Sequence, residues 1–464
     1  MEYLNRQLRT FKRQRDFNFR PKCARMNITH LGFTDDLLLF CRGNFVSVQM
    51  LYNCFQIFSQ ASGLVANADK SSIYFGGVCK DDQNAILQAL GFTKGELPFR
   101  YLGIPLSTKR TNVLQYKPLL DKILNKITSW TFSFLSYAGR LQFIKSVLFS
   151  IQIFWSQVFV LPKKVVQLIE SLCKRFLWTC SVDMSRKALI AWERLCYPKA
   201  AGGLGLLDVH AWNAAAICKL LWNLCKKKDK LWVQWVHIYY VKGRRVWDSQ
   251  ANQASWVIRK ILKAKLIFEK VGILEQDVYQ MDSFSIKKLY CKIRGDCPKV
   301  EWRRLICSNH GAPRWTFILY LAIYKRLLTK DRVAQLISVD SLVCPLCNDR
   351  NESADHVFFS CHYSFAIWDK LLQWQGINRV SGEWKNEVDW AVKNSKGRST
   401  GAIIYRMTLA CGVYCIWHER NLRLFQQRSR PASALIRQVI QEVHYMLRLQ
   451  RKLEELSFIP KEGE

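Results

Sequence analysis

Four residues of metal-binding types, closely spaced near residue 350, constrain this chain more than any other feature. Their spacing is Cys344-x2-Cys347-x8-His356-x4-Cys361, within CPLCNDRNESADHVFFSC. Three thiolates and one imidazole make the closed tetrahedral set that suits a structural Zn²⁺. The CPLC pair predicts a knuckle, the polar stretch after it a loop, and HVFFSC the return of the last two ligands over apolar residues. His362 is a less fitting ligand, because it directly follows Cys361.

The role of such a zinc domain stays open at this point. A zinc knuckle with aromatic and basic neighbours can hold single-stranded nucleic acid by stacking and charge. It can equally serve only as a staple for a small domain. The sequence favours neither.

The charge of the chain concerns its partners. Lys and Arg outnumber Asp and Glu to give a net charge of +34 over 464 residues, with local clusters at 7–15, 226–230 and 448–452. Such an excess attracts polyanions, and nucleic acid is favoured over an anionic membrane surface. The uncharged segment 146–162 is short for a membrane span and contains Gln and Ser, so a buried helix is expected there.

Cysteine usage and the N-terminal residues indicate the compartment. The 17 cysteines are odd in number and most lie among apolar neighbours, and MEYLNRQLRTFKRQR lacks the apolar stretch of a signal peptide. An intracellular, reducing environment is expected, with most cysteines acting as small buried apolar residues.

Apolar periodicity predicts a mostly helical α+β chain. A β-hairpin is expected at 26–41, with strands at 71–78 and 98–106. Segment 273–282 is polar and is interpreted as a linker. Helices are expected at 48–63 (ending at Gly63), 82–92, 113–130, 136–158, 163–178, 212–225, 231–241, 256–268 and 431–458.

The hairpin carries two adjacent acids, Asp35 and Asp36, between the apolar runs THLGF and LLLF. Adjacent Asp residues in a turn are usually only turn chemistry. Phosphoryl-transfer enzymes, however, hold two divalent ions about 3.5–4 Å apart with rigidly mounted carboxylates. Mg²⁺ is the expected ion for such an oxygen-ligand site.

Several blocks, taken in order, resemble one protein family. FTDD resembles the catalytic hairpin of reverse transcriptases. The blocks SGLVANADKSSIYFGG, PFRYLGIPLSTKR, LSYAGRLQFIKSVLFSIQIFW, FVLPKKVVQLIESLCKRFLW and AWERLCYPKAAGGLGLLD follow it. They are similar to the palm end, thumb and post-thumb region of plant-type non-LTR (LINE) retrotransposon reverse transcriptases. The segments around the cysteine cluster resemble the zinc-binding domain that follows the thumb in these proteins.

The resemblance implies roles for individual residues. Asp35 matches the metal-binding Asp of the hairpin and Asp36 the acid beside it, while Thr34 replaces a more usual Ala. Residues with implied nucleotide or primer contacts are Phe33, Lys70, Tyr101, Gly103, Arg140 and Lys145. Lys70 could face phosphates or be an ordinary solvated turn residue. The implied partners are an RNA template and a DNA primer, and target-primed copying at chromosomal DNA implies the nucleus.

The resemblance also implies that the chain is incomplete as a polymerase. The family's fingers and first catalytic Asp precede the hairpin by many tens of residues, whereas here only Glu2 and Asp16 precede Asp35 as acids. We therefore expect a truncated palm that needs a missing N-terminal polymerase segment and is inactive alone. A non-catalytic, zinc-dependent nucleic-acid-binding protein is the alternative, and a decayed gene product is a third interpretation.

The expected organisation has five parts. They are a truncated palm at 1–110, a helical thumb at 111–205, a helical post-thumb region at 206–282, the zinc-binding domain at 283–372, and a helical C-terminal region with a basic amphipathic helix at 373–464.

Overall fold

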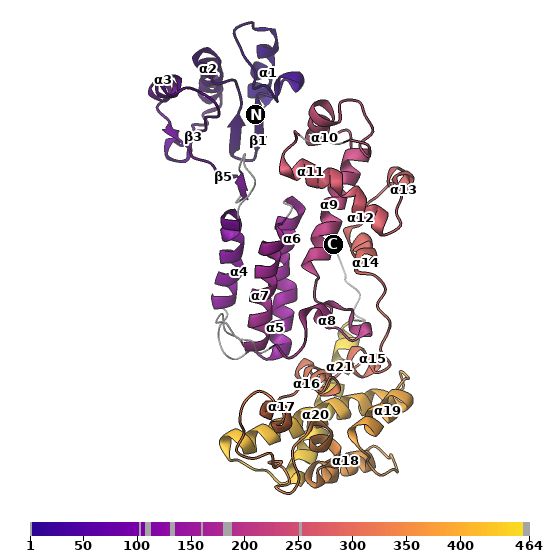
Figure 1. Ribbon diagram of the computed structural model, residues 1–464. Coiled ribbons are helices and arrows are strands. Elements are labelled where there is room, and N and C mark those ends of the chain that lie inside the picture. The colour runs from indigo at the N-terminus through magenta and orange to yellow at the C-terminus, as the bar shows by residue number, and fades with distance from the viewer. Residues whose placement is uncertain are drawn as a thin grey trace. The chain divides into compact units, whose positions relative to one another are not determined.

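The computed structural model describes residues 2–101, 104–106, 113–129, 135–158, 161–179, 188–249 and 253–457. The chain forms two compact units. One contains residues 1–118, 156–162 and 213–293, and the other contains 119–155, 163–212 and 294–464. Helices dominate both, and the described strands pair only into two-stranded sheets (Figure 1). The expected mostly helical α+β fold class is therefore confirmed.

The first unit starts with a helix, a hairpin and a second helix around a small core. Its elements up to residue 118 are α1 (Glu2–Thr10), β1 (His30–Phe33), β2 (Asp36–Leu39), α2 (Phe45–Ser62), β3 (Ser72–Ile73), α3 (Lys80–Leu90), β4 (Thr93–Lys94), β5 (Phe99–Tyr101) and β6 (Ile104–Leu106). Leu4 and Leu8 of α1 pack with Leu51 and Phe58 of α2. The inner side of β2 rests against this core through Leu37 and Leu39.

The hairpin forms within the segment 26–41 that the sequence predicts. Strand β1 pairs antiparallel with β2, and Phe33 lies opposite Asp36. Thr34 and Asp35 make the turn, and Thr34 takes a left-handed backbone with φ of 49°. That conformation is uncommon for a β-branched residue, so the turn holds a strained position directly before the acids.

Two expected strands differ from what the structure contains. Segment 98–106 forms a small antiparallel hairpin of β5 and β6 rather than one strand, with Arg100 opposite Pro105. Within 71–78, only Ser72 and Ile73 are in a strand, which pairs parallel with β4. Both segments form only short strands, because among the described residues each strand has a single short partner and no further strand pairs with it.

The remaining helices of the first unit are short except α9. They are α9 (Val209–Lys226), α10 (Leu231–Val236), the π-helical turn η7 (His237–Val241), α11 (Trp256–Lys263), α12 (Lys265–Lys270), α13 (Glu275–Gln280) and α14 (Ile286–Arg294). The expected helix at 256–268 is broken at Ala264. The expected linker at 273–282 is wrong, because α13 lies there and buries Val278 completely.

The second unit is a set of packed helices. They are α4 (Lys117–Ser129), α5 (Tyr137–Phe143), the π-helical turn η5 (Ile144–Leu148), α6 (Phe149–Val158), α7 (Lys163–Thr179), α8 (Trp192–Cys196), α15 (Arg303–Cys307), α16 (Pro313–Ile323), α17 (Lys330–Ala334), the π-helical turn η8 (His356–Ser360), α18 (His362–Trp374), α19 (Trp384–Asn394), α20 (Thr400–Gln426) and α21 (Ala432–Ser457). The long helix α20 packs against α16 and α21.

Helix α20 has the length and hydropathy of a membrane-crossing helix. Its most apolar window is 67% buried within the protein, however, as is usual for a central helix of a folded unit. It also buries charged residues: Arg406 Nη1 donates to the backbone oxygen of Ser395 at 2.6 Å. These contacts make α20 the helix around which its neighbours pack.

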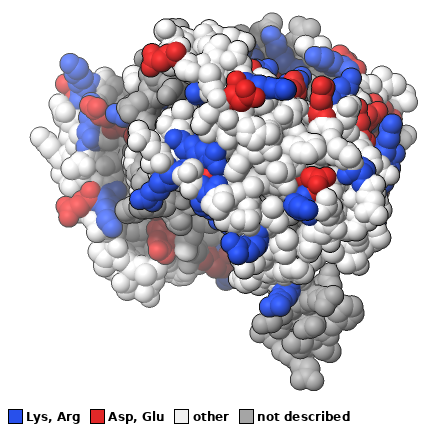
Figure 2. Space-filling view, turned by 90° about the horizontal axis from the view of Figure 1, so that it is seen from below, with Lys and Arg blue, Asp and Glu red and all other residues white. Residues whose placement is uncertain are grey.

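Surface charge is mixed on the face of the molecule that Figure 2 shows. Lys and Arg side chains stand singly or in small groups among uncharged ones, and Asp and Glu side chains lie between them. On the described residues of this face, the basic side chains are therefore not gathered into one patch.

Glu170 on α7 offers a test of packing through pH. Burial, and then the nearby carboxylates of Asp208 and Glu193, raise the pKa of Glu170 from 4.5 to about 7. The folded state thus binds a proton that the unfolded state releases, so stability is lost as pH rises from about 4.5 through about 7. We expect Glu170→Gln to stabilise the protein at pH 8 by on the order of 1 kcal/mol, after discounting for solvent screening of a half-exposed group. Below pH 4.5 the gain should vanish. Urea unfolding at pH 4.5, 6 and 8 measures this, and a pH-independent difference would contradict it.

Candidate metal centre

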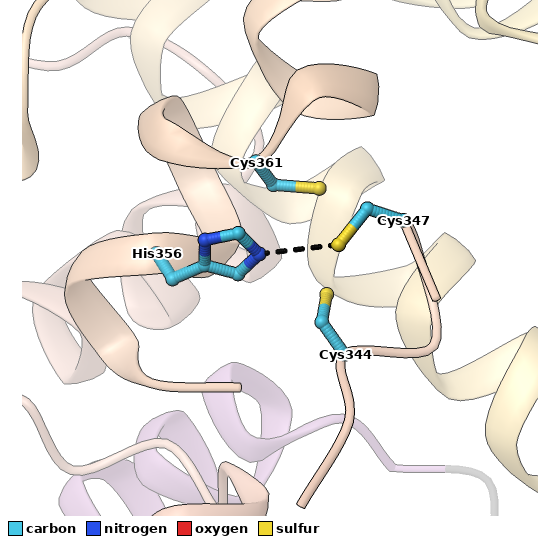
Figure 3. Close-up of side chains that lie close together, drawn as sticks. All are labelled: Cys344, Cys347, His356 and Cys361. Atoms are coloured by element: carbon cyan, nitrogen blue, oxygen red, sulfur yellow. Dashed lines mark hydrogen bonds between the residues drawn. The ribbon is translucent and has the colours of Figure 1, made fainter. Parts of the chain in front are cut away.

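The four predicted ligands come together in the second unit. One donor atom from each of Cys344, Cys347, His356 and Cys361 lies within 4.8 Å of all the others (Figure 3). Cys344 and Cys361 are fully buried, and His356 is 8% exposed. The sulfur of Cys347 lies 3.4 Å from Nε2 of His356.

This geometry fits a tetrahedral zinc ion. Zn–S bonds of about 2.3 Å and Zn–N bonds of about 2.0 Å place neighbouring ligand atoms of a tetrahedron roughly 3.5 Å apart. The separation between Cys347 and His356 agrees with this value. Four protein ligands leave no open position for water or substrate, so the donor set is that of a structural site.

The hydrogen bond between Cys344 and Cys361 changes the pKa of both thiols. The hydrogen bond from Cys344 lowers the pKa of Cys361, although burial opposes the effect. The same bond, together with burial, raises the pKa of Cys344. A metal ion binds thiolates, so a zinc ion would displace the proton that the two sulfurs share.

The first two ligands are held by a short hairpin-like knuckle. The backbone N–H of Cys344 donates to the oxygen of Arg350 at 2.8 Å, and that of Asn348 donates to the oxygen of Cys344 at 2.8 Å. Asn348 has a φ of 54°, the left-handed conformation that Asn tolerates better than most residues. The turn brings Cys347 back over Cys344.

The last two ligands are held by a π-helical turn and a helix start. His356 opens η8, and Cys361 precedes α18, with its N–H bonded to the oxygen of His356 at 2.8 Å. Phe358 and Phe359 between them are buried as expected. The ring of Phe359 stacks on Trp384 with centroids 5.5 Å apart. The metal ligands therefore rest on an aromatic core.

Helix α20 supports the knuckle with two arginines that the sequence did not single out. Arg420 forms a bidentate ion pair with Glu352, with N–O distances of 2.7 and 2.9 Å, and both side chains are buried. Arg423 donates to the backbone oxygen of Leu346 at 2.9 Å. Glu352 is one of three acids in the polar loop, with Asp349 and Asp355, and its partner lies 68 residues away, so no local pattern indicated the pair.

The hairpin acids form no comparable cluster. Asp35 and Asp36 are exposed, and Phe33 beside them is 57% exposed. Among the residues that the structure describes, the Cys₃His set is the one group of three or more His, Cys, Asp or Glu side chains close enough to share an ion. No third ligand of that kind joins the Asp pair there.

The other residues with implied nucleic-acid contacts are divided between the two units. Lys70 is exposed at the end of a short 3-10 turn (Ala68–Lys70). Tyr101 ends β5, and Gly103 lies outside the described residues. Two further residues, Arg140 and Lys145, belong to the second unit, whereas the hairpin belongs to the first.

Arg140 and Lys145 are bound to their own protein. Arg140 donates to the backbone oxygens of Leu135 at 2.9 Å and Leu177 at 3.2 Å. Lys145 donates to the oxygen of Leu204, and burial, helped by Lys199, lowers the pKa of Lys145 to about 8. Arg140 thus links α5 to α7, and Lys145 links η5 to the loop between residue 201 and α9.

Comparisons with known proteins agree with the metal centre. Residues 284–368 match a family described as zinc-binding in reverse transcriptase. A protein of Arabidopsis thaliana that carries the name ribonuclease H protein is 29% identical over 157 residues, which is 34% of this chain. The matched region spans only 24% of that relative's length. The family match, the relative and the Cys₃His cluster together relate this chain to the reverse-transcriptase proteins of retroelements.

Proposed function

We propose that the chain is the palm-end, thumb and zinc-domain part of a reverse transcriptase from a plant-type non-LTR (LINE) retrotransposon. The observation that carries the proposal is the Cys₃His cluster inside the segment similar to the reverse-transcriptase zinc-binding family. The ordered blocks from FTDD to AWERLCYPKAAGGLGLLD support it further. Its partners are then RNA and DNA, bound mainly through the phosphate backbone by a chain of net charge +34. The nucleus is the compartment that this role implies.

In this proposal zinc has a structural role. Cys344, Cys347, His356 and Cys361 would hold the ion, which supplies folding free energy and no catalytic water. Glu352 and Arg420 fix the loop between the ligands against α20. The ion would thereby keep the knuckle and α18 in place.

Nucleotidyl transfer would use Asp35 and Asp36 as ligands of Mg²⁺ at the hairpin tip. Two-metal chemistry requires carboxylates that bridge both ions and fix their spacing. The described residues bring no further ligand to this pair. We therefore infer that the isolated chain does not extend primers, and that a carboxylate from another polymerase segment would complete the site.

A primer-extension assay tests the polymerase part of the proposal. We expect the isolated chain to bind an RNA template annealed to a DNA primer, but to add no nucleotides above background with Mg²⁺ present. Asp35→Ala should leave both results unchanged, because the lone pair does not hold the two ions. Extension by the wild-type chain that is lost in Asp35→Ala would contradict the inferred inactivity. It would support a complete polymerase site.

The non-catalytic alternative is favoured by one observation. The four zinc ligands lie together in the structure, whereas no further metal-ligand side chain joins the Asp pair among the described residues. Nucleic-acid binding that depends on zinc, with no extension even after addition of a complete polymerase palm, would favour that alternative.

A further inference from the structure

A basic and aromatic surface lies in the first unit, apart from the residues discussed above. It joins residues 21–25 to the end of α10 and to η7, more than 200 positions later. Trp235 Nε1 donates to the backbone oxygen of Lys22 at 2.6 Å. The hydroxyl of Tyr239 accepts from the N–H of Arg25 at 3.1 Å. These bonds bring a basic segment onto an aromatic one.

The aromatic side chains also orient the cations. Lys22 Nζ donates to the hydroxyl of Tyr240 at 2.9 Å and lies 5.3 Å from the centre of its ring. The guanidinium of Arg25 lies 6.0 Å from the ring centre of Tyr239. Trp235 contacts both tyrosines, with ring centroids 5.7 and 5.4 Å away. Each cation is therefore held by a ring rather than by an acid.

Three more cations follow η7 in the sequence. Lys242, Arg244 and Arg245 directly follow η7 and are exposed, as are Lys22 and Arg25. Over the described residues, none of these five side chains forms an ion pair with Asp or Glu. Five exposed cations of one unit that form no ion pair among its described residues favour a polyanion as ligand.

An apolar cavity shares Trp235 with this surface. Its volume is about 260 Å³, and its walls include Trp232 and Trp235 together with aliphatic side chains of α9, α10 and α11. It is larger than a few waters of about 30 Å³ each, yet smaller than the roughly 300–1,000 Å³ pockets of drug-sized ligands. One planar ring system fits this size and lining. Trp235 belongs to both features, because its ring lines the cavity and its N–H binds the basic segment.

We propose that this surface, defined by Lys22, Arg25, Trp232, Trp235, Lys242, Arg244 and Arg245, binds single-stranded nucleic acid. The cations contact the phosphates, and one unstacked base enters the tryptophan-lined cavity. A paired base is not free to leave its stack without cost, so the surface prefers single strands to duplex. The inference rests on the proposed nucleic-acid role and adds a site to it.

Fluorescence anisotropy on the full-length chain tests the site. The probes are labelled single-stranded oligo(U) and oligo(dT) of about 20 nucleotides, and an RNA duplex of equal length. The variant K242Q/R244Q/R245Q removes three cations of the surface. The matched control K287Q/K288Q/K292Q removes three exposed cations from α14 of the same unit.

We expect the surface variant to bind both single strands about tenfold more weakly near 0.1 M salt. The plot of log association constant against log salt concentration should become less steep by about 2, because each of three lost phosphate contacts contributes roughly 0.7 to the slope. The control should retain most of its affinity. Equal losses in the two triple variants, or equal wild-type affinity for duplex and single strand, would overturn the proposed site.

Photocrosslinking provides a readout that does not depend on a variant. Oligo(U) carrying 4-thiouridine should crosslink to the wild-type chain in peptides that contain residues 22–25 and 232–245. Crosslinks found only in other peptides would overturn the site while leaving nucleic-acid binding intact. A wild-type chain that binds none of the probes would overturn both this site and the proposed nucleic-acid function.

Discussion

Cys361→Ser is expected to leave the protein without stoichiometric zinc and to loosen the segment from the knuckle to α18. Cys361 is fully buried and is one of only four ligands, so serine cannot restore the closed thiolate set. Structural zinc contributes about 10–16 kcal/mol of apparent binding free energy in zinc-finger peptides at neutral pH. Here the aromatic core around Phe358 and Phe359 remains, so we expect a smaller loss of several kcal/mol in the free energy of unfolding.

The measurement combines zinc content with urea unfolding. Cys307→Ser is the matched control, because Cys307 is an exposed cysteine of the same unit and lies outside the cluster. It should keep one zinc per chain and wild-type stability. A Cys361→Ser protein that still carries one zinc per chain would show that the ion binds elsewhere.

Arg420→Met is expected to destabilise the second unit by about 3–5 kcal/mol. The substitution leaves Glu352 as a buried carboxylate without its bidentate partner, and such a charge is costly. The backbone nitrogen of Lys330 donates to Oε2 of Glu352 at 3.3 Å, and this one weak hydrogen bond is the only compensation among the described residues. Zinc affinity should also fall, because Glu352 lies between the knuckle and His356 in sequence.

Two comparisons separate pairing from packing. In Glu352→Leu with Arg420→Met both charges are removed, and much of the lost stability should return. Arg314→Met breaks a more exposed ion pair with Glu442 and should cost no more than about 1 kcal/mol. Chemical unfolding measures all of these proteins. A double variant as unstable as Arg420→Met alone would indicate that packing, not the unpaired charge, accounts for the loss.

The features that were predictable from sequence depend on neighbouring residues. Helix α2 ends at Ser62 as expected, because Gly63 takes the left-handed conformation with φ of 72°. The hairpin formed from the two expected apolar runs, with Asp35 at its turn. The zinc ligands also fall within 18 residues, so their spacing was enough to predict the cluster that the structure contains.

The features that escaped prediction depend on distant residues or on one side chain. Helix α13 was mistaken for a linker because its segment is polar, yet it buries Val278, and the N–H of Leu274 donates to the Asp277 carboxylate at 2.8 Å. The pair of Glu352 with Arg420 joins residues that no periodicity relates. The surface around Trp235 likewise joins two basic segments from different parts of the chain.

The separation in sequence between the zinc ligands and Arg420 sets an order of events during synthesis. At about 5–20 residues per second, a ribosome adds the 59 residues from Cys361 to Arg420 in roughly 3–12 s. For that interval the knuckle can capture zinc while Glu352 still lacks its cation. The carboxylate must then stay in water, so the loop closes over it only when α20 arrives. The nascent chain would thus bind zinc before α20 packs against the loop that carries Glu352.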